Sequence, residues 1–589
     1  MTKSRVIHLA GTALLAAGVS LTGSISYAAN SGNAAWNKLA DQYFDAVYFP
    51  YQPTNGTLTG FHQYDSQLER YDRDSIAKQI AALHTFERRA SAFPKDRLDE
   101  WTAGDRQLVL NNIHGTLLTL ETIKPWEKNP DYYSTGITGS AFSLMERKFA
   151  PPEDRLRSLI ARERQMPAAL SSARQNLRDC PKIYTEIALE QLPGDIDFFR
   201  NDVPAAFSEV KDQELLSDFK LSNTAVIDAL SSYESWMKSD LLPRSNGDFR
   251  IGKDTFALKL LYDEMVTTPL DQLLQIGYAD LHKNQAAFNA LAHEVDPGKT
   301  PQQVLLMLGE DHPAPDHLLA SFRDTFNGLI AFIREKHIVT IPSDIRPTLE
   351  ETPPFMRATT QASMDTPGPF ETHSTTAYFN VTLPEKSWSA ERTADYMHAF
   401  NVGTVVSTSV HEAYPGHYIQ FLVLPEVHSK VRKLLGANTD VEGWAHYCEQ
   451  MMLDEGYGQP GTGAKDAREA KLIRLGQLQD ALLRDARFIA GIQMHSGVMS
   501  LDQAREFFVN QGYQSREIAD VETKRGTADP TYLYYTLGKL EILKLRADVE
   551  KKEGRDFSLQ KFHDEFLRQG FPPIAIIRRA MLGDDSPAL

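Results

Sequence analysis

The sequence contains little cysteine. Two cysteines occur among 589 residues, too few for a four-cysteine zinc site or for the disulfide framework of a small secreted scaffold. Any metal bound by this chain must therefore be held mainly by His, Asp or Glu. Cys180 and Cys448 would either pair in an oxidising compartment or remain two buried thiols, and the sequence leaves both alternatives open.

Basic charge and long apolar runs are also scarce. Lysine and arginine together number 62 against 78 acidic residues, which gives a net charge of −16. Nucleic acids and anionic membranes are themselves negatively charged, so we expect neither as a partner. Beyond the N-terminus no segment has the roughly 20 apolar residues that a membrane-spanning helix needs, so we expect no span in the mature chain. No pattern indicates the oligomeric state.

The N-terminus has the three parts of a secretory signal. Lys3 and Arg5 precede the apolar stretch Leu9–Leu21, and small residues lead to a cleavage site after Ala28. We therefore predict a signal peptide over residues 1–28 and a periplasmic or secreted protein. The apolar stretch is short for a membrane anchor, and the lack of cysteine near the cleavage site argues against a lipoprotein anchor.

Most of the remaining chain shows the apolar periodicity of helices. Clear stripes run through Ile76–Phe86, Leu216–Leu230 and Leu472–Leu482, which predicts a mostly α-helical protein. Residues 337–388 differ because their seven prolines exclude a continuous helix. Within them, residues 377–383 have the composition of a strand. This region is either a domain boundary or a β-hairpin with loops beside a cleft, and we favour the second.

A metal-ligating pattern follows directly, in the segment HEAYPGHYIQ at residues 411–420. Zinc peptidases usually carry two histidines four residues apart, about 40° apart around the helix, so that both face one metal. Here His411 and His417 are six apart, which a straight helix would place about 240° apart. Pro415 and Gly416 permit a distorted turn that would bring the second histidine back.

A third ligand is expected from the segment that follows. Glu442 lies 25 residues after His417 and can approach the metal from a second helix. His446 and Glu449 lie on the same face of that helix and would orient the ligands. The alternative is that Thr439 and Glu442 form a capping box and only close a helix start.

The remaining acid of the motif suggests the chemistry. Zinc lowers the pKa of a bound water, and the adjacent Glu412 would accept its proton and pass it to a leaving amine. We therefore expect a zinc-dependent hydrolase with Glu412 as the base.

Together these segments resemble a large bacterial family long catalogued as a domain of unknown function, whose members carry HExxPGHxxQ and EGWAxY. The matching segments here are HEAYPGHYIQ at 411–420 and EGWAHY at 442–447. His446 stands where the family has leucine, so we do not expect it to be a ligand. Further similarities run through Phe379–Asn380, Arg487–His495, Ser500–Ala504 and Pro530–Lys539.

The resemblance implies a large helical body, similar to the helical zinc carboxypeptidases and oligopeptidases, with a deep cleft, a metal on its floor and a small sheet nearby. The metal ligands would be His411, His417 and Glu442, and Asn380 would contact the substrate. We expect an N-terminal helical region over residues 29–336 and a metal-binding catalytic region over 337–589, packed as one compact unit.

Peptide hydrolysis also needs a donor for the developing oxyanion. Tyr535 is the first candidate, followed by Tyr534, Tyr532 and His495, whereas core packing would be the ordinary role of this tyrosine cluster.

Arg487 and Arg525 would bind a substrate carboxylate, or else form surface salt bridges. The strand at residues 377–383 would hold an extended peptide by edge pairing.

We therefore expect a zinc metallopeptidase that hydrolyses short peptides. The alternatives are a metal-dependent hydrolase acting on other amides or esters, and a binding protein with a vestigial cleft.

Overall fold

The computed structural model of the protein describes residues 31–145, 147–352 and 361–589. The predicted signal peptide, residues 1–28, lies outside the described residues. Helix accounts for 71% and strand for 3% of the structure, which confirms a mostly α-helical protein with a small mixed sheet. Of the helices that are described, none is both long enough and apolar enough to cross a bilayer.

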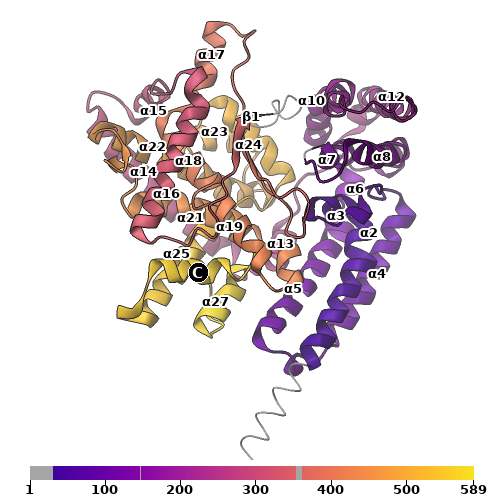
Figure 1. The fold of residues 1–589 in the computed structure, drawn as a ribbon, viewed down its shortest axis with the longest axis horizontal. Helices are drawn as coiled ribbons and strands as arrows, with labels where there is room; N and C mark the ends of the chain where they lie inside the picture. Colours follow the sequence, from indigo (N-terminus) through magenta and orange to yellow (C-terminus); the bar gives the residue numbers. More distant parts are fainter. Residues whose placement is uncertain (1–30, 146, 353–360) are drawn as a thin grey trace, which may run out of the picture.

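The chain folds into an N-terminal lobe, residues 31–245, and a larger body formed by the described residues after 245 (Figure 1). The lobe contains two apolar clusters, and one of them also includes Val431, Leu435 and Ile576 of the body. The helices of the lobe, after helical residues 31–43, are α2 (Phe49–Tyr51), α3 (Pro53–Thr59), α4 (Arg73–Ser91), α5 (Glu100–Leu117), α6 (Pro125–Lys128), α7 (Asp131–Met145), α8 (Pro152–Glu163), α9 (Met166–Asn176), α10 (Lys182–Asp197), α11 (Val203–Ala206) and α12 (Gln213–Trp236).

The body surrounds one long central helix, α22, whose residues are buried along most of its length. Its helices are α13 (Lys253–Glu264), α14 (Leu270–Val295), α15 (Pro301–Gly309), α16 (Leu318–Lys336), α17 (Ala390–Met397), α18 (Val402–Glu412), α19 (His417–Val423), α20 (Lys430–Leu434), α21 (Asn438–Asp454), α22 (Ala467–His495), α23 (Leu501–Asn510), α24 (Arg516–Ala528), α25 (Tyr534–Glu553), α26 (Leu559–Leu567) and α27 (Ile574–Leu582).

Local signals explain several of these helix starts. The Asp72 carboxylate accepts the Ser75 N–H and caps α4, and Asp466 accepts two amides at the start of α22. Helix α14 packs on α22, and helix α16 packs on α18. The largest core thus contains residues from both sides of the division predicted at residue 336, which does not separate two cores.

Two helix pairs of the body cross with their backbones in contact. A Cβ on Gly403 of α18 would lie 2.9 Å from Gly476 Cα of α22. A Cβ on Gly443 of α21 would lie 2.6 Å from Gly538 Cα of α25. Since Cβ atoms do not approach other carbons this closely, each crossing requires glycine. These four helices carry most of the predicted site residues.

A three-stranded mixed sheet has the order β1-β3-β2, with β1 (Thr348–Glu351) parallel and β2 (Ala362–Asp365) antiparallel to β3 (Tyr378–Val381). The strand predicted at 377–383 is therefore confirmed as β3. Its predicted edge pairing with a peptide is wrong, because β3 is the central strand and both of its edges are used. The edge strand β2 contacts α18. The short strands β4 (Gln459–Pro460) and β5 (Gly463–Ala464) form a separate pair.

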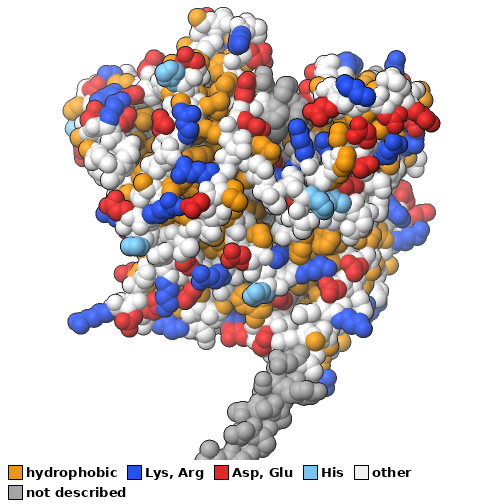
Figure 2. Space-filling model, viewed as in Figure 1, with side chains coloured by type: hydrophobic (Ala, Val, Ile, Leu, Met, Phe, Trp, Pro, Cys, Tyr) orange, Lys and Arg blue, Asp and Glu red, His pale blue; other side chains and the backbone are white. Residues whose placement is uncertain are grey.

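Cys180 and Cys448 are two buried free thiols, which decides between the two alternatives that the sequence left open. At the surface, Figure 2 shows acidic and basic side chains interspersed over one face of the protein, without a continuous area of either sign on that face.

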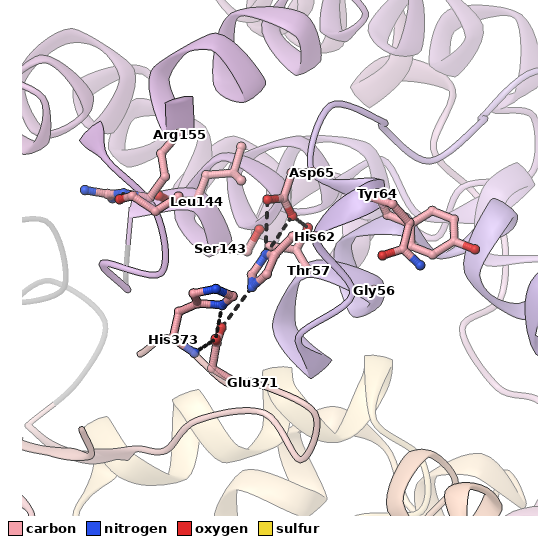
Figure 3. Close-up of polar contacts among 12 residues, drawn as sticks. Gly56, Thr57, His62, Tyr64, Asp65, Ser143, Leu144, Arg155, Glu371 and His373 are labelled. Atoms are coloured by element: carbon pink, nitrogen blue, oxygen red, sulfur yellow. Dashed lines mark hydrogen bonds and ion pairs between the residues drawn. The ribbon is translucent and has the colours of Figure 1, made fainter. Parts of the chain in front are cut away.

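A histidine with two carboxylate partners helps to join the lobe to the segment between β2 and β3 (Figure 3). His62 Nδ1 lies 3.1 Å from an Asp65 oxygen, and its Nε2 lies 2.9 Å from an oxygen of Glu371. The imidazole stacks on Phe149. Burial acts to lower the pKa of His62, but the two carboxylates raise it above its ordinary value. The pKa of Glu371 is lowered: burial would raise it, and hydrogen bonds from His373, His62 and Ser374 outweigh burial.

This contact predicts a pH-dependent contribution to stability. A raised histidine pKa stabilises the folded protein fully below the unfolded pKa of about 6.5, and this contribution is lost as pH rises through the raised pKa. His62→Gln should therefore lower the free energy of unfolding by about 1 kcal/mol near pH 6 and by less near pH 9. Urea unfolding at both pH values measures this, with His317→Gln, at a 74% exposed side chain, as the control. An equal loss at both pH values would contradict the prediction.

Candidate metal centre

The two histidines of the motif are brought together by a break between two helices. Helix α18 ends at Glu412, and α19 begins at His417 after a turn through Pro415 and Gly416. The imidazole rings of His411 and His417 lie 4.8 Å apart between centroids and nearly perpendicular. The six-residue spacing is therefore accommodated by a turn between two helices.

The turn leaves no room for a side chain at position 416. The Gly416 N–H donates to the Val410 carbonyl at 3.0 Å. A Cβ on Gly416 would lie 1.8 Å from the His411 carbonyl oxygen, which is shorter than any non-bonded contact. The backbone of His411 thus packs directly on the turn that positions His417.

Glu442 of α21 completes a cluster of three ligand atoms. One oxygen, Oε2, lies 3.4 Å from Nε2 of His411 and 3.5 Å from Nε2 of His417. Ligand atoms about 2.0–2.1 Å from a tetrahedral zinc ion lie about 3.3–3.4 Å apart, so these two distances fit such an ion. The same oxygen is buried without a hydrogen-bond partner. Across the described ranges, these residues are the single group of three whose donor atoms converge closely enough to hold a metal.

The start of α21 is fixed by a carboxylate from elsewhere in the chain. Glu264, the last residue of α13, accepts the backbone N–H groups of Asn438 and Thr439 at 3.2 and 2.9 Å. Ala437 is the N-cap and makes no side-chain cap. The alternative in which Thr439 and Glu442 form a capping box is therefore wrong, and the Glu442 carboxylate is left for the cluster.

His411 is oriented by a buried acid. Its Nδ1 lies 2.6 Å from Glu449 Oε1, so Nδ1–H donates to the carboxylate and Nε2 keeps its lone pair for a metal. The second oxygen of Glu449 accepts from His446, and Arg484 lies 3.0 Å from the first. Burial would raise the pKa of Glu449, but Arg484 and the two imidazoles hold it well below its ordinary value.

His417 is oriented by a neutral acceptor. Its Nδ1 lies 3.2 Å from the Gln420 amide oxygen, which again leaves Nε2 toward Glu442. The Gln420 amide nitrogen donates to a side-chain oxygen of Asp440 at 3.3 Å. This second contact fixes which end of the amide faces the histidine.

The electrostatics of the cluster favour a positive charge. Burial acts to lower the pKa of His411, but the nearby carboxylates of Glu442 and Glu449 raise it to about 10. Burial would likewise raise the pKa of Glu442, yet the two imidazoles hold it well below its ordinary value. A divalent cation and a proton therefore compete for the same atoms.

A cavity of about 400 Å3 opens beside these atoms. Besides the three candidate ligands, the predicted residues Glu412, Tyr535, Arg487 and Arg525 line it. A larger cavity of about 460 Å3 lies between the lobe and the body and reaches Asn438 rather than the ligand atoms.

The three tyrosines differ in what their hydroxyl groups do. Tyr535 lines the cavity, and its hydroxyl accepts from Arg525 Nη2 at 3.4 Å, which leaves its own proton free to donate. The Tyr534 hydroxyl donates to Asp529 at 3.1 Å. Tyr532 is fully buried and is not part of the cavity wall.

Two predicted residues lie away from the cavity. His495 is the last residue of α22, about two helical turns beyond Arg487, with Nε2 2.8 Å from the Gly526 carbonyl and Nδ1 accepting the Ile251 N–H. Burial lowers its pKa to about 4. Asn380 lies on the central strand β3 and is 3% exposed. The structure brings neither residue to the cavity wall.

Besides Ser407 and Thr408, sequence reasoning missed two charged wall residues, Asp480 and Arg484. They are four residues apart on α22, so they share a helix face. This spacing is a signal that could have been read, but α22 carries many charges, and nothing local distinguishes this pair.

A family model described as "Bacterial protein of unknown function (DUF885)" matches residues 53–581. The chain belongs to this family. The match covers all of the candidate ligands and the cavity wall, and it confirms the resemblance to a bacterial family of unknown function. Members of DUF885 are defined by their sequence, and the description assigns them no activity.

Two solved structures share the fold over nearly the whole chain. A candidate lipoprotein of unknown function from Shewanella oneidensis is 26% identical, with a TM-score of 0.78, and covers 93% of this chain and 99% of its own. A candidate lipoprotein from Colwellia psychrerythraea is 18% identical, with a TM-score of 0.76, and covers 93% and 98%. A comparison with curated proteins finds no significant match.

The contact between Gln420 and His417 predicts an effect on metal affinity. Gln420→Leu keeps the size of the side chain but removes the acceptor for Nδ1–H. The zinc dissociation constant should rise about 10- to 100-fold. Competition with a fluorescent chelator measures it, after circular dichroism shows that the variant is folded. The control is Gln450→Leu on α21, where the glutamine amide donates to Asp454 at the surface. Unchanged zinc affinity in a folded Gln420→Leu variant would contradict this role.

Proposed function

We propose that this protein is a zinc-dependent metallopeptidase that hydrolyses short peptides. The observation that carries the proposal is the convergence of His411 Nε2, His417 Nε2 and Glu442 Oε2 beside a polar cavity, with the carboxylate oxygen 3.4 and 3.5 Å from the two nitrogens. Two histidines and one carboxylate with an open fourth position are a ligand set of catalytic zinc.

In the proposed reaction, the metal site and Glu412 would have separate roles. A bound zinc ion would polarise the scissile carbonyl and lower the pKa of a bound water. Glu412 follows His411 directly and lines the cavity, where its carboxylate would take one proton from the attacking water. It would then deliver that proton to the leaving nitrogen. Water thus adds across the amide, with its hydroxyl on the carbonyl carbon and its proton on the amine.

Tyr535 is the best placed donor for the oxyanion. Its hydroxyl accepts from Arg525, so its proton can point into the cavity. Tyr534 lacks this freedom because its proton is given to Asp529. A donor aimed at developing charge in a partly enclosed site stabilises the transition state more than the ground state.

An exported location is part of the proposal. The N-terminal sequence has the parts of a signal peptide. The two structural neighbours are described as candidate lipoproteins.

A substrate panel separates a peptidase from other metal hydrolases. Zinc-loaded protein is assayed against di- and tripeptides and against simple esters of similar size. Peptide turnover that is lost with a chelator and regained with zinc supports the proposal. Turnover of esters without peptides favours the other hydrolase, and no turnover with zinc bound favours a binding protein.

Glu412→Gln should keep zinc and lose activity. The amide cannot accept a proton, so kcat for a cleaved peptide should fall about 10²- to 10⁴-fold. Metal analysis should still find one zinc per chain, because position 412 is not among the candidate ligands. Peptide hydrolysis at the wild-type rate would exclude Glu412 as the base.

The two neighbouring tyrosines provide a matched pair. Tyr535→Phe should lower kcat about 10²- to 10³-fold, because it removes an oxyanion donor. Tyr534→Phe removes a hydroxyl of the same kind from the same helix turn but should change kcat much less. Steady-state kinetics of both variants on one peptide makes the comparison. Similar losses in both would show that the hydroxyls act by packing or through Arg525.

A further inference from the structure

We infer that the cavity accepts the C-terminal end of its substrate and that Arg525 binds the terminal carboxylate, which makes the protein a carboxypeptidase. This inference rests on the proposed peptidase function. Three arginines line the cavity, Arg484, Arg487 and Arg525. They differ in how much of each guanidinium group remains available to a ligand.

Arg487 already binds a protein carboxylate. Its Nε and Nη2 donate to the two oxygens of Glu522 at 2.6 and 2.7 Å, and its side chain is 10% exposed. This is the paired geometry of a strong contact between a guanidinium group and a carboxylate. The guanidinium also lies 5.0 Å from the Tyr535 ring centre. Arg487 is therefore a positioning residue that ties α22 to α24 and supports Tyr535.

Arg484 is committed to the ligand-orienting acid. Its Nη2 lies 3.0 Å from Glu449 Oε1, and its Nη1 donates to the other oxygen at 3.5 Å. Its Nε is buried without a partner, out of reach of a ligand in the cavity. A substrate could engage Arg484 only by displacing the carboxylate that holds His411.

Arg525 has donors to spare. Its hydrogen bonds to described residues use Nη2, which contacts Asp529 at 3.3 Å, the Tyr534 hydroxyl at 3.3 Å and the Tyr535 hydroxyl at 3.4 Å. In the described part of the chain, Nε and Nη1 have no hydrogen-bond partner. The side chain is 35% exposed, the most of the three arginines. A carboxylate oxygen can therefore accept a charge-assisted hydrogen bond from Nη1 or Nε of Arg525 without displacing a protein group.

The apolar cluster beside Arg525 favours the end of a substrate peptide over the middle of a longer one. Tyr535 and Tyr534 belong to a packed apolar cluster with Ala486, Ala490 and Tyr532. No extended peptide can continue through that cluster. A substrate carboxylate that binds Arg525 would therefore lie beside this packed cluster, as the end of a chain would.

The same chemistry could come from an acidic side chain, so the experiment separates the two sources. Zinc-loaded wild-type protein is assayed with benzoyl-Gly-Phe, with its C-terminal amide, and with benzoyl-Gly-Glu amide. We expect kcat/KM for the free acid to exceed that for either amide about 10- to 100-fold, the value of a charge-assisted pair. Arg525→Gln should remove this preference mainly by raising KM for the acid, and Arg525→Lys should retain part of it.

The matched control is Arg505→Gln. Arg505 lies on α23, is similarly exposed at 32%, and pairs with Asp502 and Asp520 away from the cavity. This variant should have the wild-type kcat/KM for all three substrates. Equal cleavage of acid and amides by wild type, or a preference that survives in Arg525→Gln, would overturn the inference while the peptidase function stands. Equal cleavage of benzoyl-Gly-Glu amide and the free acid would also overturn it. If wild type with zinc cleaves none of the three, the peptidase function fails together with the inference.

Discussion

The candidate centre depends on two places where helix backbones touch. Gly403 of α18 meets Gly476 of α22, and Gly443 of α21 meets Gly538 of α25. Any side chain at these positions would push the helices apart by more than the tolerance of a metal site, which is a few tenths of an ångström. The glycines therefore set the distance between Glu442 and the helices that face it. Packing in the core and the geometry of the ligands are in this sense one constraint.

A chain of buried polar contacts transmits that geometry to the ligand atoms. His411 is hydrogen-bonded to Glu449, and Glu449 in turn contacts His446 and Arg484. His417 is hydrogen-bonded to Gln420, and the Gln420 amide is hydrogen-bonded to Asp440. One histidine thus has an ionised partner and the other a neutral one. A charged partner increases the basicity of an imidazole more than an amide does, so the two ligands are electronically unequal.

The features of the fold and of the candidate site that could be predicted from the sequence are those that depend on residues close together in the chain. The helical class, β3 and the two histidines follow from short-range periodicity and from one Pro-Gly turn. The cap of α21 does not, because Glu264 lies 174 residues before Asn438. The central place of β3 depends on two partners that only the tertiary fold defines. The difference between Arg487 and Arg525 depends on Glu522, which nothing in the sequence pairs with one arginine rather than the other. His495 matched a family pattern, yet the fold uses it to bridge backbone groups.

The remote cap of α21 has a consequence for the order of folding. The first turn of this helix has no local side-chain cap, so its end is stabilised only after α13 has docked. Contacts between such distant segments are slow to form because a long loop must close first. A chain that folds after export would therefore complete the ligand cluster late, once the body is assembled. Tight metal binding would then require the complete tertiary structure, and partly folded chains would bind the ion weakly.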